Sequence, residues 1–302
     1  MKIVITGGCG FIGSNLVDEL ILLNHNVVVI DNLSSDAHDE FYYNKKATYY
    51  KDDITNKHII NGIFERHKPD YVFHLAAEAR IQNCINDPIK AYNVNTTGTL
   101  NILEASRMFG VKRIMFSSTS AIYGLNQTYP QTEKLTPHCL NMYSYSKLFS
   151  EGLFKLYSET YNVDSVCFRY FNVYGPRQPV RGSYAPVIGV FSRQKKLGDP
   201  MTIVGDGLQT RDYVHVSDVV QANIAAMNKQ DNLNAEIINI GTNKAFSVLE
   251  LAIQMGGEYN HIAPRQGEAR HTLADITKAK KLLGWEPKKD LLDYLRNEEY
   301  KK

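Results

Sequence analysis

Short apolar runs alternate with longer stretches of helical periodicity in the first half of the chain. The runs are rich in Val, Ile and Phe, which is typical of strands covered on both faces of a parallel sheet. They occupy residues 2–6, 27–30, 71–75, 113–116 and 165–168, and the helical patterns between them cover 14–24, 59–67, 92–109 and 142–161. Strands that alternate with helices predict right-handed βαβ units, and hence an α/β fold with a Rossmann-type doubly wound parallel sheet.

The pattern changes after residue 169. Residues 173–186 are rich in Gly, Pro and Arg and are expected to form an irregular loop. A helix is predicted over 214–228 and a strand over 237–240, and 248–294 looks helical with a break at 263–267. We therefore expect a Rossmann domain over 1–168, to which 213–240 return, and a smaller C-terminal cap built mainly from 169–302.

Three evenly spaced glycines follow the first predicted strand. Gly7, Gly10 and Gly13 form the pattern Gly-x-x-Gly-x-x-Gly and open the first helix. Glycines there allow a tight turn and a close approach of the backbone to a pyrophosphate, which the helix N-terminus would stabilise. Asp31 ends the second strand, where a carboxylate accepts hydrogen bonds from ribose hydroxyls and repels a 2′-phosphate. The pair predicts NAD as cofactor, with a turn-capping role as the alternative for Asp31.

Two groups of polar residues predict proton transfer. Tyr143 and Lys147 are four residues apart, so a helix places them on one face, where an ammonium would favour the phenolate. A Ser/Thr cluster at 117–120 leaves the end of an apolar strand, where the ligand crevice of a parallel sheet lies. Taken alone, either pattern also fits a surface helix or a turn that satisfies backbone groups.

Composition narrows the function classes. The chain has 302 residues, 43% hydrophobic and 22% charged, with a net charge of +2, so no nucleic-acid partner is expected. No run is long enough to span a membrane, and the first apolar run is too short for a signal peptide. The four cysteines are scattered, with no metal-ligand spacing, which predicts reduced thiols and a cytoplasmic location.

Several motifs together resemble the extended short-chain dehydrogenase/reductase superfamily. They are Thr6–Ser14, Asp31-Asn32, His74-Leu-Ala-Ala77, Asn93-Val-Asn95, Ser117–Gly124, Tyr143–Lys147 and the segment 169–177. The resemblance extends from Lys2 to about Pro287 and is greatest to the UDP-glucose 4-epimerase group, which includes UDP-N-acetylglucosamine 4-epimerases.

The resemblance implies roles for individual residues. Thr119, Tyr143 and Lys147 would be catalytic, with Tyr143 as the base. Besides the three glycines, Asp31, Tyr143 and Lys147, the implied cofactor contacts are Phe11, Ile12, Asn32, Ser34, Asp53, Ile54, Leu75, Ala76, Ala77, Asn95, Ser117 and Tyr170. Besides Thr119, the implied substrate contacts are Asn172, Tyr184, Ala185, Thr202, Val204, Arg211, Arg265 and Thr272. The helices over 92–109 and 142–161 would pair with their copies in a homodimer, although their apolar residues could equally be buried within one chain.

The implied reaction is 4-epimerisation of a UDP-hexose through transient oxidation at C4. Dehydratases and decarboxylases of this superfamily typically carry Thr-Asp-Glu or Thr-Ser-Glu where this chain has Thr119-Ser120-Ala121, which disfavours both. Thr272 matches a position that is small in epimerases of N-acetyl sugars, so UDP-N-acetylglucosamine is expected as well as, or in place of, UDP-glucose. UDP-glucuronate stays open because Arg80 or Arg181 could meet a carboxylate. An NAD-sensing protein without activity and a dehydrogenase that releases a keto sugar are further alternatives.

Overall fold

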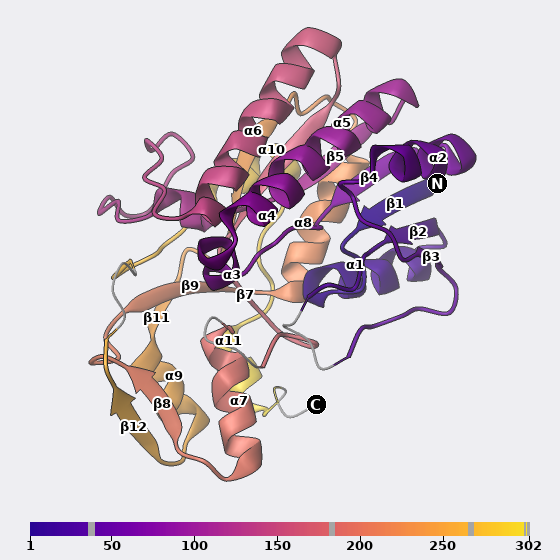
Figure 1. Ribbon diagram of the computed structural model, residues 1–302. Helices are drawn as coiled ribbons and strands as arrows, with labels where there is room; N and C mark the ends of the chain where they lie inside the picture. The colour runs from indigo at the N-terminus through magenta and orange to yellow at the C-terminus, as the bar shows by residue number, and fades with distance from the viewer. Residues whose placement is uncertain (36–39, 181–184, 265–268, 299, 301–302) are drawn as a thin grey trace.

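A seven-stranded parallel sheet forms the centre of the protein (Figure 1). The computed structural model describes residues 1–302 except 36–39, 181–184, 265–268, 299 and 301–302. The strand order is β10-β6-β5-β4-β1-β2-β3. Their bounds are β1 Lys2–Thr6, β2 Asn26–Ile30, β3 Thr48–Tyr50, β4 Tyr71–His74, β5 Arg113–Thr119, β6 Ser165–Tyr170 and β10 Glu236–Ile240. The predicted Rossmann-type α/β fold is therefore confirmed.

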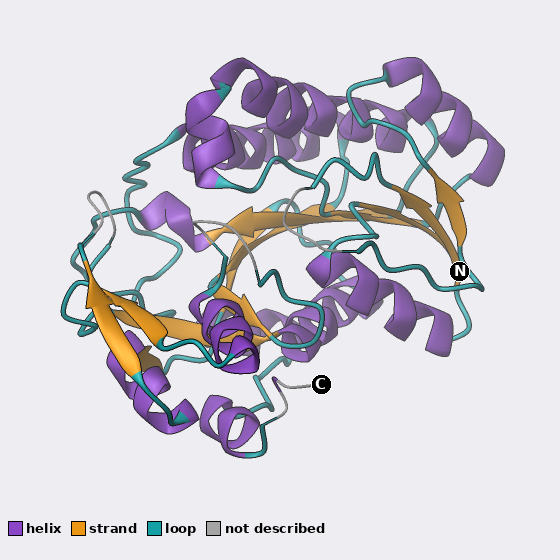
Figure 2. Cartoon of the chain, turned by 60° about the horizontal axis from the view of Figure 1, so that its bottom comes forward, coloured by secondary structure: helices purple, strands orange, loops and turns teal. Residues whose placement is uncertain are grey.

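Helices cover both faces of this sheet (Figure 2). On one face α1 and α8 pack against the strands, and Leu16 and Val219 belong to one core cluster with Ile5. On the other face α2, α5 and α6 contribute to a second cluster. The bounds are α1 Phe11–Leu22, α2 Lys57–His67, α5 Thr99–Met108, α6 Met142–Tyr161 and α8 Val216–Asn228. Burial on both faces explains why the strands read as uninterrupted apolar runs.

Elements of the second half form a third core cluster around Phe191, Ile203 and Leu251. A three-stranded sheet β11-β9-β7 and a two-stranded sheet β12-β8 lie beside three helices (Figure 1). The bounds are β7 Asn172–Tyr174, α7 Val187–Leu197, β8 Met201–Val204, β9 Thr210–His215, β11 Ala245–Ser247, α9 Val248–Met255, β12 Tyr259–Ile262 and α11 Leu291–Arg296. The segment β10 pairs with β6, and α8 packs on α1, so part of the second half lies with the main sheet. The boundary between the two domains stays a prediction.

Several elements differ from the pattern-based expectation. The helix expected over 92–109 consists of α4 Pro88–Tyr92, a π-helix η1 Asn93–Gly98 and α5, because side chains enter its hydrogen-bond ladder. The strand β5 continues to Thr119, since its polar end pairs with β6 up to Tyr170. The stretch 248–294 holds α9, β12, α10 Thr277–Leu283 and α11, and β12 is exposed along its whole length, so no alternation signals it. Sequence patterns also missed β3, α3 Ile81–Asn86, β8, β9 and α7.

None of the described helices is both long enough and apolar enough to cross a membrane.

Candidate active site

A cleft of about 360 Å³ opens at the carboxyl ends of the parallel strands. It lies where β1 has β2 on one side and β4 on the other, the point at which the strand order reverses and at which open α/β sheets bind ligands. The cleft brings together most of the predicted cofactor residues: Gly7, Gly10, Phe11, Ile12, Gly13, Asp31, Asn32, Ser34, Asp53, Ile54, Leu75, Ala76, Ala77, Ser117, Tyr143, Lys147 and Tyr170. Ala185, a predicted substrate contact, lines it too.

The glycine loop has no room for side chains at its two ends. A Cβ on Gly13 would lie 2.2 Å from the carbonyl oxygen of Gly7. A Cβ on Gly7, which has a φ of +72°, would lie 2.7 Å from the backbone nitrogen of Ala76. The loop therefore packs its own backbone against that of the next strand end, and α1 begins directly after Gly10, which cannot supply a capping side chain. This cradle fits the pyrophosphate of a dinucleotide.

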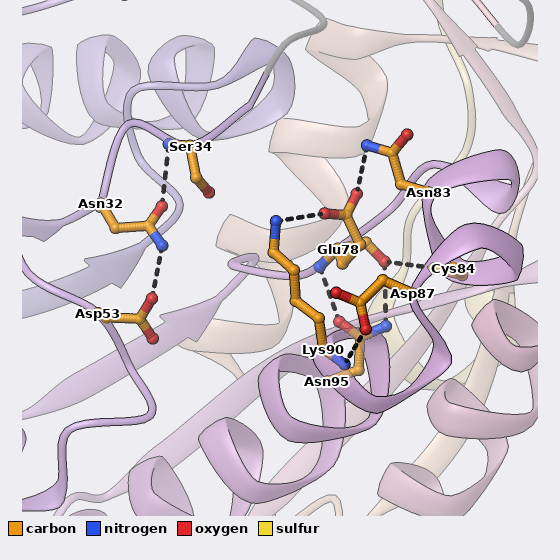
Figure 3. Close-up of polar contacts among 9 residues, drawn as sticks. All are labelled: Asn32, Ser34, Asp53, Glu78, Asn83, Cys84, Asp87, Lys90 and Asn95. Atoms are coloured by element: carbon orange, nitrogen blue, oxygen red, sulfur yellow. Dashed lines mark hydrogen bonds and ion pairs between the residues drawn. The ribbon is translucent and has the colours of Figure 1, made fainter.

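Acidic and amide side chains line one side of the cleft (Figure 3). The carboxylate of Asp31 accepts hydrogen bonds from the backbone nitrogens of Cys9 and Leu33, both at 2.9 Å. It therefore caps the following turn and also lines the cleft, and its contact with the ribose of NAD stays a prediction. Asn32 donates to the Asp53 carboxylate at 2.7 Å. Burial opposes ionisation of Asp53, yet hydrogen bonds from Thr55 and Asn32 hold its pKa below the usual range.

Glu78 lies on the opposite wall of the cleft and contacts several residues there (Figure 3). Its backbone nitrogen and oxygen bind the side-chain amide of Asn95 at 2.8 and 3.0 Å. Its carboxylate accepts from Asn83 at 3.3 Å and lies 3.7 Å from the Lys90 ammonium. Asn95 was predicted to contact the cofactor, but the structure places it behind this wall, 1% exposed. Its amide also donates to Ser146, so it joins the wall to α6.

A buried chain of hydrogen bonds with a defined direction runs behind the cleft through His74. The Thr99 hydroxyl donates to the Asn95 carbonyl, so its oxygen accepts from Nε2–H of His74. The opposite nitrogen, Nδ1, then accepts from the Thr6 hydroxyl at 2.7 Å, and Thr6 accepts from the Ala76 amide. Burial lowers the pKa of His74 to about 3, so the imidazole is neutral near pH 7, and this hydrogen-bond pattern assigns its proton to Nε2.

Two of the predicted catalytic residues, Tyr143 and Lys147, line one end of the cleft, and the third, Thr119, contacts Tyr143 from the end of β5. Lys147 donates to the carbonyl of Ser117 at 2.8 Å, and its burial lowers its pKa to about 7. Burial raises the pKa of Tyr143 to about 12, partly offset by a hydrogen bond with Thr119. Contrary to the sequence-based expectation, the protein groups alone therefore do not make Tyr143 a phenolate near neutral pH. The loss of solvation on burial raises its pKa more than the hydrogen bond with Thr119 lowers it. Thr119 ends β5 and also accepts from the amide of Ala121 at 3.1 Å.

The predicted substrate residues other than Ala185 and Thr119 lie on neighbouring strands and loops of the second half. The amide of Asn172 on β7 donates to the Asp212 carbonyl, and the amide of Asp212 donates to the Thr272 hydroxyl. Thr202 and Val204 are on β8, where the Thr202 hydroxyl accepts from Gln194. Arg211 donates to two backbone carbonyls on β9 and at Arg270. Tyr184 and Arg265 lie outside the described residues.

Cleft residues that the sequence patterns missed follow the predicted motifs directly in the chain. Glu78 and Ala79 come after the His-Leu-Ala-Ala segment, and Ser118 lies within the Ser/Thr cluster. Arg80, which the sequence offered as a partner for a sugar carboxylate, lines the cleft beside them. Their position at a strand end was the available signal, since the loops there line the crevice. The other missed lining residues are Ile30, Ser35, Phe41, Asp52, Lys90, Val94, Pro179 and Pro186.

Comparisons with known proteins agree with this geometry. The crystal structure of a UDP-glucose 4-epimerase with UDP-glucose from Thermotoga maritima is 39% identical, with a TM-score of 0.93, and the match covers 100% of this chain and 98% of that one. A UDP-N-acetylglucosamine 4-epimerase from Methanobrevibacter ruminantium, solved with UDP-N-acetylmuramic acid, is 32% identical with a TM-score of 0.91, covering 99% and 97%. A UDP-glucose 4-epimerase from Mycolicibacterium smegmatis is 34% identical over 95% of this chain and 94% of its own length. Residues 3–241 match the model of the NAD-dependent epimerase/dehydratase family, and the chain belongs to that family.

Proposed function

We propose that the protein is an NAD-dependent 4-epimerase of UDP-hexoses. The observation that carries this proposal is that Tyr143 and Lys147 line one end of a cleft built on the glycine loop, with Thr119 hydrogen-bonded to Tyr143. The relatives named as UDP-glucose and UDP-N-acetylglucosamine 4-epimerases support the same reaction. Asp31 on the cleft wall favours NAD over NADP, since its carboxylate would repel a 2′-phosphate.

Bound NAD would supply a hydride acceptor and donor at sugar C4. Tyr143 would take the proton of the sugar 4-hydroxyl and later return it. Thr119 would hold the same hydroxyl through its own side chain, and the Lys147 ammonium would stabilise the phenolate. Burial keeps the pKa of Tyr143 high, and the positive charge of a bound nicotinamide ring would add to that of Lys147 and oppose this effect.

The turn after Thr119 argues against elimination chemistry. Ser120 and Ala121 begin the 3₁₀ turn η2 Ser120–Tyr123, and neither side chain carries an acid or base of the strength that loss of water across C5–C6 demands. We therefore propose epimerisation without net oxidation, rather than dehydration or release of a keto sugar.

For the nucleotide we propose that Asn172, Thr202, Val204, Arg211 and Thr272 bind the UDP-sugar, together with Ala185, Tyr184 and Arg265. The first five lie on β7, β8, β9 and the segment that pairs with β9 near His271. Because Thr is small, Thr272 leaves space for a 2-acetamido group, which favours UDP-N-acetylglucosamine and its galacto epimer. We further propose that residues 1–168 bind NAD and that 169–302 mainly form the substrate cap.

One observation favours a uronic acid as the second candidate. Arg80 lines the cleft, where its guanidinium could pair with a sugar carboxylate. Product analysis with UDP-N-acetylglucosamine, UDP-glucose and UDP-glucuronate in parallel, without added NAD, tests both. UDP-N-acetylgalactosamine as product supports the proposal together with a retained cofactor. Conversion of UDP-glucuronate alone would transfer the proposal to uronic acids, and no conversion of any of the three would refute it.

We also propose a cytoplasmic homodimer. Leu100 and Met108 on α5 and Phe149 and Leu156 on α6 are exposed apolar side chains on adjacent helices (Figure 1). Pairing these helices with a second copy would bury them in a four-helix bundle. Light scattering should give twice the chain mass, and Phe149→Glu should give the monomer. All four cysteines are buried free thiols, which suits a reducing compartment, and cell fractionation would test that location.

A further inference from the structure

Helix α6 holds the end of β5 at two consecutive residues. Lys147 donates to the carbonyl of Ser117 at 2.8 Å, and Glu151 accepts from the hydroxyl of Ser118 at 2.5 Å. Lys147 and Glu151 are four residues apart, so both project from the same face of α6. The next residue of β5 is Thr119. The strand end that presents the proposed catalytic hydroxyl is therefore anchored immediately before that residue.

Glu151 is itself held by an arginine from the neighbouring strand. Arg169 on β6 donates to both carboxylate oxygens, at 3.0 and 2.7 Å, and both side chains are 2% exposed. The guanidinium also lies over the ring of Tyr123, 4.9 Å from its centroid. A bidentate pair fixes orientation as well as distance, and burial leaves few other positions for either group.

The strand register places these residues at one level of the sheet. Ser118 pairs directly with Arg169, and Thr119 pairs with Tyr170. Glu151 therefore binds one residue on each of two adjacent strands, Ser118 on β5 and Arg169 on β6. Both contacts lie one residue before Thr119 and its strand partner Tyr170. Three elements, α6, β5 and β6, meet at this point.

We infer that Glu151, held by Arg169, is a positioning residue for the proposed reaction, because it fixes Ser118 and thereby sets Thr119 against Tyr143. This inference rests on the proposed function. Loss of the contact should affect turnover more than binding, since Glu151 and Arg169 do not appear among the described residues that line the cleft.

The charge of Glu151 has a second consequence for Lys147. Burial lowers the pKa of Lys147, and the negative charge of Glu151 raises it again. The other titratable groups that interact with Lys147 are Cys84 from α3, Cys167 from β6 and His74 from β4. Burial raises the pKa of both thiols and lowers that of His74, so all three are neutral near pH 7. Glu151 therefore supports the ammonium form of Lys147.

Ser118→Ala tests positioning while leaving the ion pair in place. We expect kcat to fall about tenfold, because misplacement of a catalytic group by about 1 Å can cost about 100-fold and loss of one hydrogen bond should shift Thr119 by less. The KM for the UDP-sugar should not change, and kcat is compared at equal NAD content because Ser118 also lines the cleft. Hydrogen exchange at the amides of residues 117–121 should become faster. Ser165→Ala is the matched control, since it removes a buried hydroxyl without a hydrogen-bond partner from the far end of β6. It should change neither kcat nor the hydrogen exchange of residues 117–121.

Glu151→Gln tests the charge. The amide keeps the size of the side chain and accepts from Ser118, but the ammonium of Lys147 loses its support. The decrease of kcat at high pH, which follows deprotonation of Lys147, is the alkaline limb of the pH profile. In Glu151→Gln this limb should move to lower pH by about 0.5 to 1 unit, whereas Ser118→Ala should leave it in place. A purely structural role would lower stability without moving the limb.

The inference would be overturned if Ser118→Ala had the kcat and the hydrogen exchange of the wild type. It would also be overturned if a folded Glu151→Gln protein kept the alkaline limb of its kcat profile at the wild-type pH. If Glu151→Gln fails to fold, Ser118→Ala decides alone. If the wild-type protein converts no UDP-sugar, the proposed function fails, and the exchange of residues 117–121 still decides whether Ser118 holds the strand end.

Discussion

Gly13→Ala should disrupt the cofactor cradle from within. The new Cβ would lie 2.2 Å from the Gly7 carbonyl oxygen and 2.8 Å from the Cα of Gly8. Both are backbone atoms of the same loop, so neither can rotate away, and ordinary contact needs about 1 Å more than the first distance. Helix α1 must therefore move relative to the loop, against strands that are buried on both faces.

The expected cost has two parts. Overpacking of this kind lowers the free energy of unfolding by about 1–3 kcal/mol. Displacement of the loop by about 1 Å also removes its fit to a pyrophosphate, so the NAD affinity should fall at least about tenfold, equivalent to about 1.4 kcal/mol. NAD per chain after gel filtration measures the second part, and urea unfolding measures the first.

Gly62→Ala provides a matched control. Gly62 lies in the interior of α2, and no atom lies within 4 Å of the place that an added methyl group would take, so the same substitution should stabilise the protein by about 0.5–1 kcal/mol. Its NAD content should equal that of the wild type. A Gly13→Ala protein with wild-type NAD content and stability would refute the steric reasoning, whatever the result for Gly62→Ala.

Four further predictions follow from single contacts. Tyr143→Phe should lower kcat by about 10²–10⁴-fold because it removes the proton-transfer group, while the NAD content measured by absorbance stays unchanged. Asp164→Asn should lower the free energy of unfolding in urea by about 3–5 kcal/mol, because it leaves the buried guanidinium of Arg113, at 2.5 Å, without its counter-charge. Burial lowers the pKa of His215 to about 4, below about 6.5 in the unfolded chain. The stability that neutral His215 gives the folded protein is therefore fully present above pH 6.5 and is lost as the pH falls toward 4. His215→Gln should reduce the slope of the free energy of unfolding between these pH values by about 1.4 kcal/mol per pH unit. Thr272→Tyr should abolish conversion of UDP-N-acetylglucosamine and spare that of UDP-glucose in a chromatographic assay, and equal loss of both would contradict the role proposed for Thr272.

Much of the main sheet and the cofactor end of the site could be predicted because their signals are local. A strand buried on both faces is an apolar run, the glycine loop lies between that strand and its helix, and a spacing of four residues places Tyr143 and Lys147 on one helix face. The second half was predicted less well. The strand β12 is short and exposed throughout, so no alternation marks it, and its partner β8 is separated from it in the chain by β9, α8, β10, β11 and α9.

The sequence by itself determined the parallel sheet, the glycine loop that opens α1 and the pairing of a tyrosine with a lysine, since each depends on residues close together in the chain. The tertiary structure decided which distant residues support them. Glu78 meets Asn95 only because the loop after β4 packs on a π-helix, and Arg169 reaches the Glu151 that binds Ser118 because β5 and β6 pair in that register. It also decided the ionisation of Tyr143, whose pKa is raised by burial. Register, burial and the approach of one backbone to another depend on how whole elements pack, and a residue pattern does not contain them.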